Sequence, residues 1–229
     1  MSIFYDLHMH SCLSPCGDND MTPFNLVNMA ALKGLDIIAL TDHNTCKNCG
    51  SAVEAGKEAG IRVLPGMELC TSEDIHVVCL FPAVDNAMAF DDYVYKRIPK
   101  IKNRPEIFGE QLIMDKEDNV VGKEELLLVT ASEISIDNVD LLVKSFDGIS
   151  FPAHIDKNAY SVLSSFGQFP EEIGFRTVEV TSRADREELK RVHPALRTKR
   201  FISNSDAHYL WDINEKINSI ESDELFRIL

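Results

Sequence analysis

Positive charge is scarce in this chain of 229 residues, which has 23 Lys and Arg against 37 Asp and Glu and a net charge of −14. A long nucleic-acid track needs clustered Lys and Arg. We therefore expect a small phosphorylated substrate and no long nucleic-acid track. Divalent metal ions can supply the positive charge that such a substrate needs, so the composition favours a metal-assisted site over a basic binding surface.

The sequence also has no long apolar run, and we expect no secretory leader. The longest apolar runs, Ile37–Leu40 and Val77–Phe81, are too short to span a bilayer. The first residues lack the basic and apolar regions of a signal peptide. We therefore expect a cytoplasmic protein without membrane contact or structural disulfides, and the oligomeric state stays open.

Short β-rich runs alternate with helical segments along the chain. Strands are predicted at Ile3–Leu7, Asp36–Thr41, Arg62–Gly66, His76–Phe81, Ile149–Ala153, Thr177–Thr181 and Phe201–Asn204. Helices are predicted over Phe24–Lys33, about 50–59 and about 137–146. This rhythm favours a single α/β domain over residues 1–229, built as a TIM-like barrel of about seven strands, with a doubly wound open sheet as the alternative. Residues of about 84–130 form an inserted excursion or partial lid, with a β-hairpin predicted at Gln111–Gly122.

Side chains able to bind metal ions cluster at the ends of these strands. The clustered residues are His8, His10, Asp42, His43, Glu68, His76, His154, Asp206 and His208. His8 and His10 are two residues apart, so both project to one side of their strand. Most members follow a strand, as the site residues of α/β barrels do, whereas His76 opens its strand.

The residue types of this set favour a transition-metal centre. A single His at a strand end is more often an ordinary hydrogen-bonded loop residue, but six of the seven His fall in these clusters. Imidazole combined with carboxylate suits Zn²⁺, Mn²⁺ or Fe²⁺ rather than Ca²⁺. Glu68, one carboxylate among many His, is a natural bridge between two ions.

The motifs DLHMH, ALTDH, GMEL, IHVVCLF, PAH and NSDAH, in this order, resemble the PHP (polymerase and histidinol phosphatase) family of metal-dependent phosphoesterases. Within the family, they are most similar to the bacterial ribonuclease AM and nucleotide-phosphatase-like group. The resemblance covers nearly the whole chain apart from about residues 84–145. It implies a distorted seven-stranded (β/α) barrel with a trinuclear site, and hence two to three divalent ions, at the C-terminal face of the strands.

The resemblance also implies a role for each matched residue. The first ion would be held by His8, His10, Glu68 and Asp206. Glu68 would bridge to a second ion, held also by His76 and His154. His43 and His208 would hold the third ion together with an Asp, and Asp42 would orient a neighbouring ligand.

The opening loop departs from the family pattern. Pro15 stands five residues after His10, where the family has its third-site Asp. Counting back five residues from Pro23 gives Asp18, which we predict as the ligand, with Asp20 and Cys16 as alternatives.

The cysteines of the first two site loops have several possible roles. Cys12, Cys16, Cys46 and Cys49 could meet as a Cys₄ zinc or iron–sulfur site. Cys46 and Cys49 could instead form a redox dithiol, or all four could be free thiols in packed loops. Cys70 and Cys79 lie in apolar runs and are expected to be buried as small hydrophobes.

These residues predict metal-dependent hydrolysis of a small phosphomonoester, a nucleotide or a short oligonucleotide end. A hydroxide held between ions would attack phosphorus in line. The catalytic set is His8, His10, Glu68, His154, Asp206 and His208, and Lys157 and Arg183 are candidate substrate-binding cations. The alternatives are a metal-dependent amide or deacetylation hydrolase and a non-catalytic metal-binding module.

Overall fold

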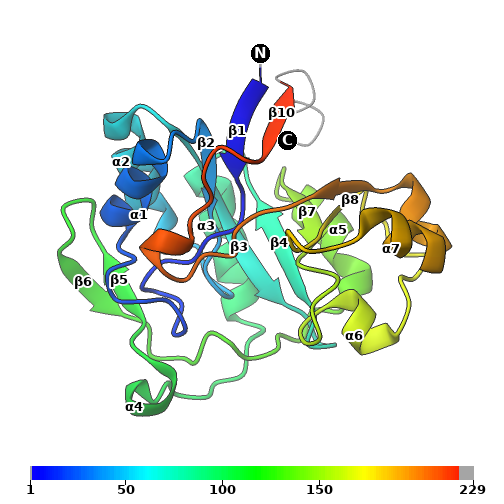
Figure 1. Ribbon diagram of the computed structural model, residues 1–229. Helices are drawn as coiled ribbons and strands as arrows, with labels where there is room; N and C mark the ends of the chain where they lie inside the picture. The colour runs from blue at the N-terminus through cyan, green and yellow to red at the C-terminus, as the bar shows by residue number, and fades with distance from the viewer. Residues whose placement is uncertain (1, 222–229) are drawn as a thin grey trace.

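A sheet curled into a half-barrel organises this α/β fold. The computed structural model describes residues 2–221, and Figure 1 shows the main strands side by side with helices packed around them. In spatial order, the six strands are β10 (Ser219–Glu221), β1 (Ser2–Asp6), β2 (Ile37–Leu40), β3 (Arg62–Cys70), β4 (His76–Leu80) and β7 (Ile149–Pro152). A separate two-stranded ladder joins β8 (Thr177–Glu179) to β9 (Arg200–Ile202).

The predicted closed barrel of seven strands is not confirmed. The last strands are short, with four residues in β7 and three each in β8 and β9, so they offer few backbone groups for continuous ladders. Isolated contacts link the two sheets instead: the Ile155 amide donates to the Glu179 carbonyl at 2.9 Å, and a bridge joins Met9 to Ala207. The strands β1, β2 and β3 are parallel, whereas β4 is antiparallel to both β3 and β7.

Apolar side chains fill both faces of the sheet. One core is built from strand residues and their immediate neighbours, among them Leu7, Ile37, Ala39 and Phe151. The alternate residues of β2 join the larger core under the helices. The continuous apolar run over β2 is therefore explained by burial on both faces, as expected for a parallel strand.

Helices cover the sheet, and their ends follow the local sequence. They are α1 (Pro23–Leu32), α2 (Cys49–Ala59), α3 (Val84–Tyr95), α5 (Ile136–Lys144), α6 (Val162–Phe166) and α7 (Arg186–Val192), with short 3₁₀ helices at Pro194–Thr198 and Leu210–Asp212. The Thr22 hydroxyl accepts a hydrogen bond from the Asn25 amide at 3.2 Å and caps α1. Gly34 follows α1 with a φ of +76°, a backbone conformation that favours glycine. Among residues 2–221, no helix is long and apolar enough to cross a membrane.

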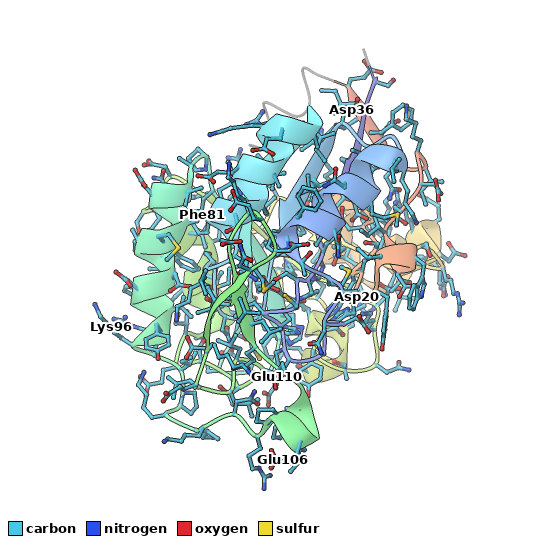
Figure 2. All side chains as sticks on the ribbon, turned by 90° about the vertical axis from the view of Figure 1, so that its left-hand side faces the viewer. Asp20, Asp36, Phe81, Lys96, Glu106 and Glu110 are labelled. Carbon is cyan, nitrogen blue, oxygen red and sulfur yellow. The ribbon has the colours of Figure 1, made fainter. Side chains whose placement is uncertain are left out.

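Residues 84–130 contain α3, α4 (Pro105–Phe108) and a hairpin. The hairpin pairs β5 (Leu112–Met114) with β6 (Val120–Lys123) in antiparallel register, which confirms the predicted turn structure. In Figure 1, α4 lies at the end of the molecule away from β10 and the start of β1. In Figure 2, Asp36, just before β2, lies at the opposite end from Glu106 in α4. The first strands therefore run toward the end that carries α4.

Candidate metal centre

The predicted metal ligands lie on six strands or in the loops that follow them, with His154 after β7 and Asp206 and His208 after β9. His8 and His10 follow β1, His43 follows β2, and Glu68 lies within β3. The prediction that Glu68 follows its strand is wrong, because pairing with β4 extends β3 to Cys70. His76 is the first residue of β4, opposite Cys70. Because β4 is antiparallel, its beginning lies at the edge where β1 and β2 end, which explains how a strand-opening residue reaches the site.

Glu68 stands at the centre of the cluster and is 1% exposed. Five imidazole rings surround its carboxylate: Oε1 lies 3.1 Å from His8, 3.0 Å from His76 and 3.2 Å from His154, and Oε2 lies 3.3 Å from His10 and 2.9 Å from His43. Burial would raise the pKa of Glu68, but the charges of His76, His8 and His43 outweigh it and hold the pKa well below its usual range. Glu68 is therefore ionised, and its negative charge faces five imidazole rings.

One group of ligand atoms has the composition of a first ion site. His8, His10, Glu68 and Asp206 each place one ligand atom within 4.8 Å of the others. Asp206 Oδ1 lies 3.3 Å from both His8 Nε2 and His10 Nε2, and these two nitrogens are 3.3 Å apart. Two imidazoles and two carboxylates converging in this way form a donor set that suits zinc, manganese or iron.

Further groups of ligand atoms lie beside the first. They are His43, Glu68 and His76, and His10, His43 and His208. The Nδ1 atoms of His43 and His154 are buried without a hydrogen bond, which is rare in folded proteins. His43 Nδ1 is 2.9 Å from Glu68 without hydrogen-bonding geometry. A buried ring nitrogen without a hydrogen-bond partner is free to bind a metal ion.

Outer hydrogen bonds orient the rings. Asp42 Oδ1 accepts from the Ser14 hydroxyl at 2.7 Å, and Ser14 Oγ lies 2.9 Å from His10 Nδ1. His208 Nδ1 donates to the Asp206 carbonyl at 2.8 Å. Such partners fix the tautomer and direct the other ring nitrogen toward an ion. Asp42 therefore has the geometry of the orienting role that the family resemblance implies.

Glu179 is a site residue that sequence reasoning missed. Its carboxylate lies 2.9 Å from His8 Nδ1 and accepts from the His154 amide at 2.8 Å and from Asn204 Nδ2 at 2.6 Å. Burial would raise the pKa of Glu179, but His8 holds it below its usual value. The one sequence signal was a carboxylate between two valines, at the end of the short strand β8.

The rings differ in their affinity for protons. Burial lowers the pKa of an imidazole, but Asp206 and Glu68 raise that of His10 to about 9, and Glu68 raises that of His43 to about 9. For His208, burial and the nearby charge of His10 lower the pKa to about 3. His208 is therefore neutral at physiological pH, as a metal-binding imidazole must be.

A cavity of about 630 Å³ opens onto these side chains. Its lining includes metal-capable residues together with Cys16, Phe108, Val129, Lys157, Asn158, Ala159 and Tyr160. Lys157 Nζ donates to Asp206. Arg183, the other predicted substrate-binding cation, is exposed and does not line the cavity. The volume is within the range of small-molecule pockets.

The opening loop does not bring every candidate to the site. Asp18 Oδ1 accepts a hydrogen bond from the Asp20 amide at 2.9 Å, and neither carboxylate joins a potential metal group of the described residues. Cys16 is exposed and lines the cavity, and its thiol likewise joins no potential metal group of the described residues.

The other cysteines do not gather with Cys16. Cys12 is buried, with its thiol 3.9 Å from the Leu112 carbonyl. The thiols of Cys46 and Cys49 both donate to the Gly66 carbonyl. A Cys₄ site is therefore absent from residues 2–221. Cys70 and Cys79 are buried, as predicted.

Comparisons with known proteins agree with this geometry. The model of the PHP domain family matches residues 6–173. A 5′-3′ exoribonuclease of Haemophilus influenzae is 39% identical over 79 residues, which are 33% of this chain and 28% of that protein. A 3′,5′-nucleoside bisphosphate phosphatase of Chromobacterium violaceum is 36% identical over 73 residues, which are 32% of this chain and 25% of that protein. The matches therefore span less than half the length of these relatives.

Solved structures show a similar fold. A lesion-specific endonuclease of Pyrococcus furiosus superimposes with a TM-score of 0.66 at 17% identity, over 92% of this chain and 49% of that one. A structure of endonuclease Q in complex with a 27-mer duplex has a TM-score of 0.67 at 16% identity, over 92% of this chain and 50% of that one.

These findings correct one expectation. The prediction of small phosphorylated substrates with no long nucleic-acid track is wrong, because a relative is named an exoribonuclease and a protein of this fold binds duplex DNA. Net charge averages over the whole surface, so it does not report the local charge of a site. The family prediction, in contrast, is confirmed by a model that matches well over half of the sequence. The chain belongs to the PHP domain family.

Proposed function

We propose that this chain is a metal-dependent phosphoesterase that hydrolyses phosphoester bonds of a nucleic-acid strand. The observation that carries the proposal is the Glu68 carboxylate, which five imidazoles surround at 2.9–3.3 Å beside a cavity of nucleotide size. A buried carboxylate with this many His around it is costly unless the group has a function.

Three ion positions can be proposed from the donor atoms. His8, His10, Glu68 and Asp206 would hold the first ion, and Glu68 with His76 and His154 the second. His43 and His208 would contribute to a third. Bound divalent ions would acidify water and neutralise the charge of the phosphate, and the donors suit zinc, manganese or iron.

The protein's own side chains would position the substrate. Lys157 reaches the cavity beside Asp206, and ion-pairing with Asp206 outweighs burial and raises its pKa, so it is a cation at neutral pH. We propose that Lys157 contacts a phosphate oxygen. Glu179 would hold the His8 ring in place, and Asp42 would do the same for His10 through Ser14.

Aromatic side chains beside the metal ligands favour a nucleic acid as the substrate. Phe108 and Tyr160 line the cavity and are 37% and 50% exposed. The Tyr160 ring stacks on the His76 ring, with centroids 4.8 Å apart and an angle of 17° between the planes. Aromatic side chains are the usual platforms for bases of single-stranded nucleic acids. They would hold a base next to the phosphate being cleaved.

The proposal is tested with end-labelled RNA and DNA oligonucleotides and added Mn²⁺. We expect cleavage by the native chain, loss of cleavage in His10→Ala, and retention in the matched control His193→Ala, whose residue lies outside the cavity. Circular dichroism checks that both variants fold. Hydrolysis of amides but not phosphoesters would contradict the proposal in favour of an amide or deacetylation hydrolase. Bound metal without turnover on any phosphoester would instead indicate a non-catalytic module.

A further inference from the structure

We infer that Cys16 supplies a thiolate ligand to an ion held by His43 and His208, so that this position is a mixed imidazole–thiolate site. The inference rests on the proposed metal centre and adds the identity of one ligand and a preference for thiophilic ions. Its basis is the arrangement of the loop over residues 11–18 and the supply of donor atoms around the cavity.

The ion position at His43 and His208 lacks ligands unless another residue contributes. His10 is near both rings, with centroid distances of 4.5 and 4.3 Å. Its Nδ1 atom, however, is bonded to Ser14, and its Nε2 atom faces Glu68 and Asp206 at 3.3 Å each. Although a ligand atom of His10 lies within 4.8 Å of those of His43 and His208, His10 is assigned here to the first ion, and the remaining two imidazoles fall short of the four ligands usual for zinc.

Cys16 is a cavity-lining donor that the other proposed ion positions do not use. It is exposed, whereas the other five cysteines are buried. It lines the same cavity as His43 and His208. Cys16 contributes, after Glu68, to the raised pKa of the His43 ring, so the two side chains are neighbours. The Nδ1 atom of that ring is buried without a hydrogen bond and lies 2.9 Å from Glu68, so an ion could bind this ring without breaking a hydrogen bond at Nδ1.

The backbone holds the Cys16 loop against the site. The Ser14 amide donates to Ser11 at 3.1 Å, and the Gly17 amide donates to Ser14 at 2.8 Å. A Cβ atom at Gly17 would lie 2.4 Å from the Ser11 carbonyl oxygen, so this turn needs glycine. The Asp18 amide donates to the His208 carbonyl at 2.9 Å. A backbone hydrogen bond therefore joins the Cys16 loop directly to His208, the other residue proposed to bind the ion.

The acidic alternatives in the loop have other partners or face solvent. Asp18 Oδ1 accepts from the Asp20 amide and closes a turn of its own loop. Asp20 is exposed. Neither carboxylate lines the cavity. A side chain committed to a local turn away from the cavity is a poor candidate ligand, and this leaves Cys16.

A thiolate would change which ion this position selects. Soft sulfur ligands favour zinc over manganese or magnesium, which prefer oxygen. Coordination requires the deprotonated thiol, so the Cys16 proton would pass to solvent when the ion binds. His208 already presents a free Nε2, because its Nδ1 is bonded to the Asp206 carbonyl.

Cobalt substitution tests the assignment directly. The native chain, stripped by a chelator and loaded with Co²⁺, should show a thiolate-to-cobalt charge-transfer band in the near ultraviolet. Cys16→Ser should lose the band and about one bound ion per chain, as counted by elemental mass spectrometry. Asp18→Asn, the matched control, should keep both. Because Cys16 is the exposed cysteine, a thiol reagent should modify one thiol in the folded, stripped chain and none after zinc is added.

The outcomes separate this inference from the proposed function. Ions bound without a thiolate band, or a band and ion count unchanged in Cys16→Ser, would overturn the Cys16 assignment and leave the phosphoesterase proposal intact. Loss of an ion in Asp18→Asn with no loss in Cys16→Ser would assign the ligand to Asp18 instead. A native chain that binds no ion at all would overturn both.

Discussion

Replacing Glu179 by Gln tests whether the second layer of hydrogen bonds controls the metal centre. The two carboxylate oxygens of Glu179 serve donors on both sides: Oε2 accepts from His8 Nδ1 and the His154 amide, and Oε1 accepts from Asn204 Nδ2. Glutamine keeps one acceptor oxygen and turns the other into a donor. One of the buried donors must then face an NH₂ group.

The expected losses of folding free energy and metal affinity follow from these contacts. A buried donor left without an acceptor costs about 1–3 kcal/mol of folding free energy. Loss of an outer partner of a metal-ligating His lowers metal affinity or activity about 10–100-fold. Because His8 loses its negatively charged partner, we expect Glu179→Gln to show both effects.

The assay is a titration of the stripped chain with Zn²⁺, paired with urea unfolding. Glu124→Gln is a suitable control, since Glu124 is a buried carboxylate that accepts from Lys47 but does not line the cavity. The control should lose stability and keep its metal affinity. If Glu179→Gln also loses only stability, Glu179 does not act on the metal centre and the reasoning fails.

Three further predictions concern protons and substrate. Because the pKa values of His10 and His43 are raised to about 9, an ion must displace their protons at neutral pH. Metal affinity should rise roughly tenfold per pH unit for each displaced proton and level off near pH 9, and calorimetric titrations at several pH values would contradict this if affinity were flat. Burial raises the pKa of Asp6 to about 6, so its contribution to stability is present below pH 4 and is lost as the pH rises through 6. This amounts to about 3 kcal/mol, and urea unfolding of the ion-free chain should show Asp6→Asn without this part of the pH dependence. Phe108→Ala should raise KM for an oligonucleotide by about 5–150-fold, from the 1–3 kcal/mol of one base stack, and leave KM for glycerol phosphate unchanged; equal effects on both substrates would rule out base stacking.

The clustering of the His and carboxylate side chains could be predicted from the sequence, because the spacing of residues along a strand determines which side they face. His8 and His10 lie on one side of the chain because side chains alternate along a strand, and both contact Glu68. The reversal of β4 could not be predicted, since strand direction depends on pairing partners rather than on local pattern. The position of His76 was therefore known only from the family resemblance until the antiparallel pairing explained it.

Two other features could not be predicted from the local sequence. Glu179 is 171 residues from His8 along the chain. A single carboxylate in an apolar strand does not show which distant residue it contacts. The Asp18 prediction rested on counting residues between motifs, whereas the loop turns that carboxylate toward its own backbone. Closure of the barrel is also not confirmed, because the lengths of β7, β8 and β9 are set by tertiary packing.

The most direct test of the central claim is a crystal structure of the metal-loaded chain with anomalous data collected at the zinc and manganese edges. We predict at least two anomalous peaks within coordination distance of the Glu68 carboxylate, one of them shared with His8, His10 and Asp206. Fewer than two peaks with both metals supplied, or peaks that all lie away from Glu68, would contradict a multinuclear centre built on this residue.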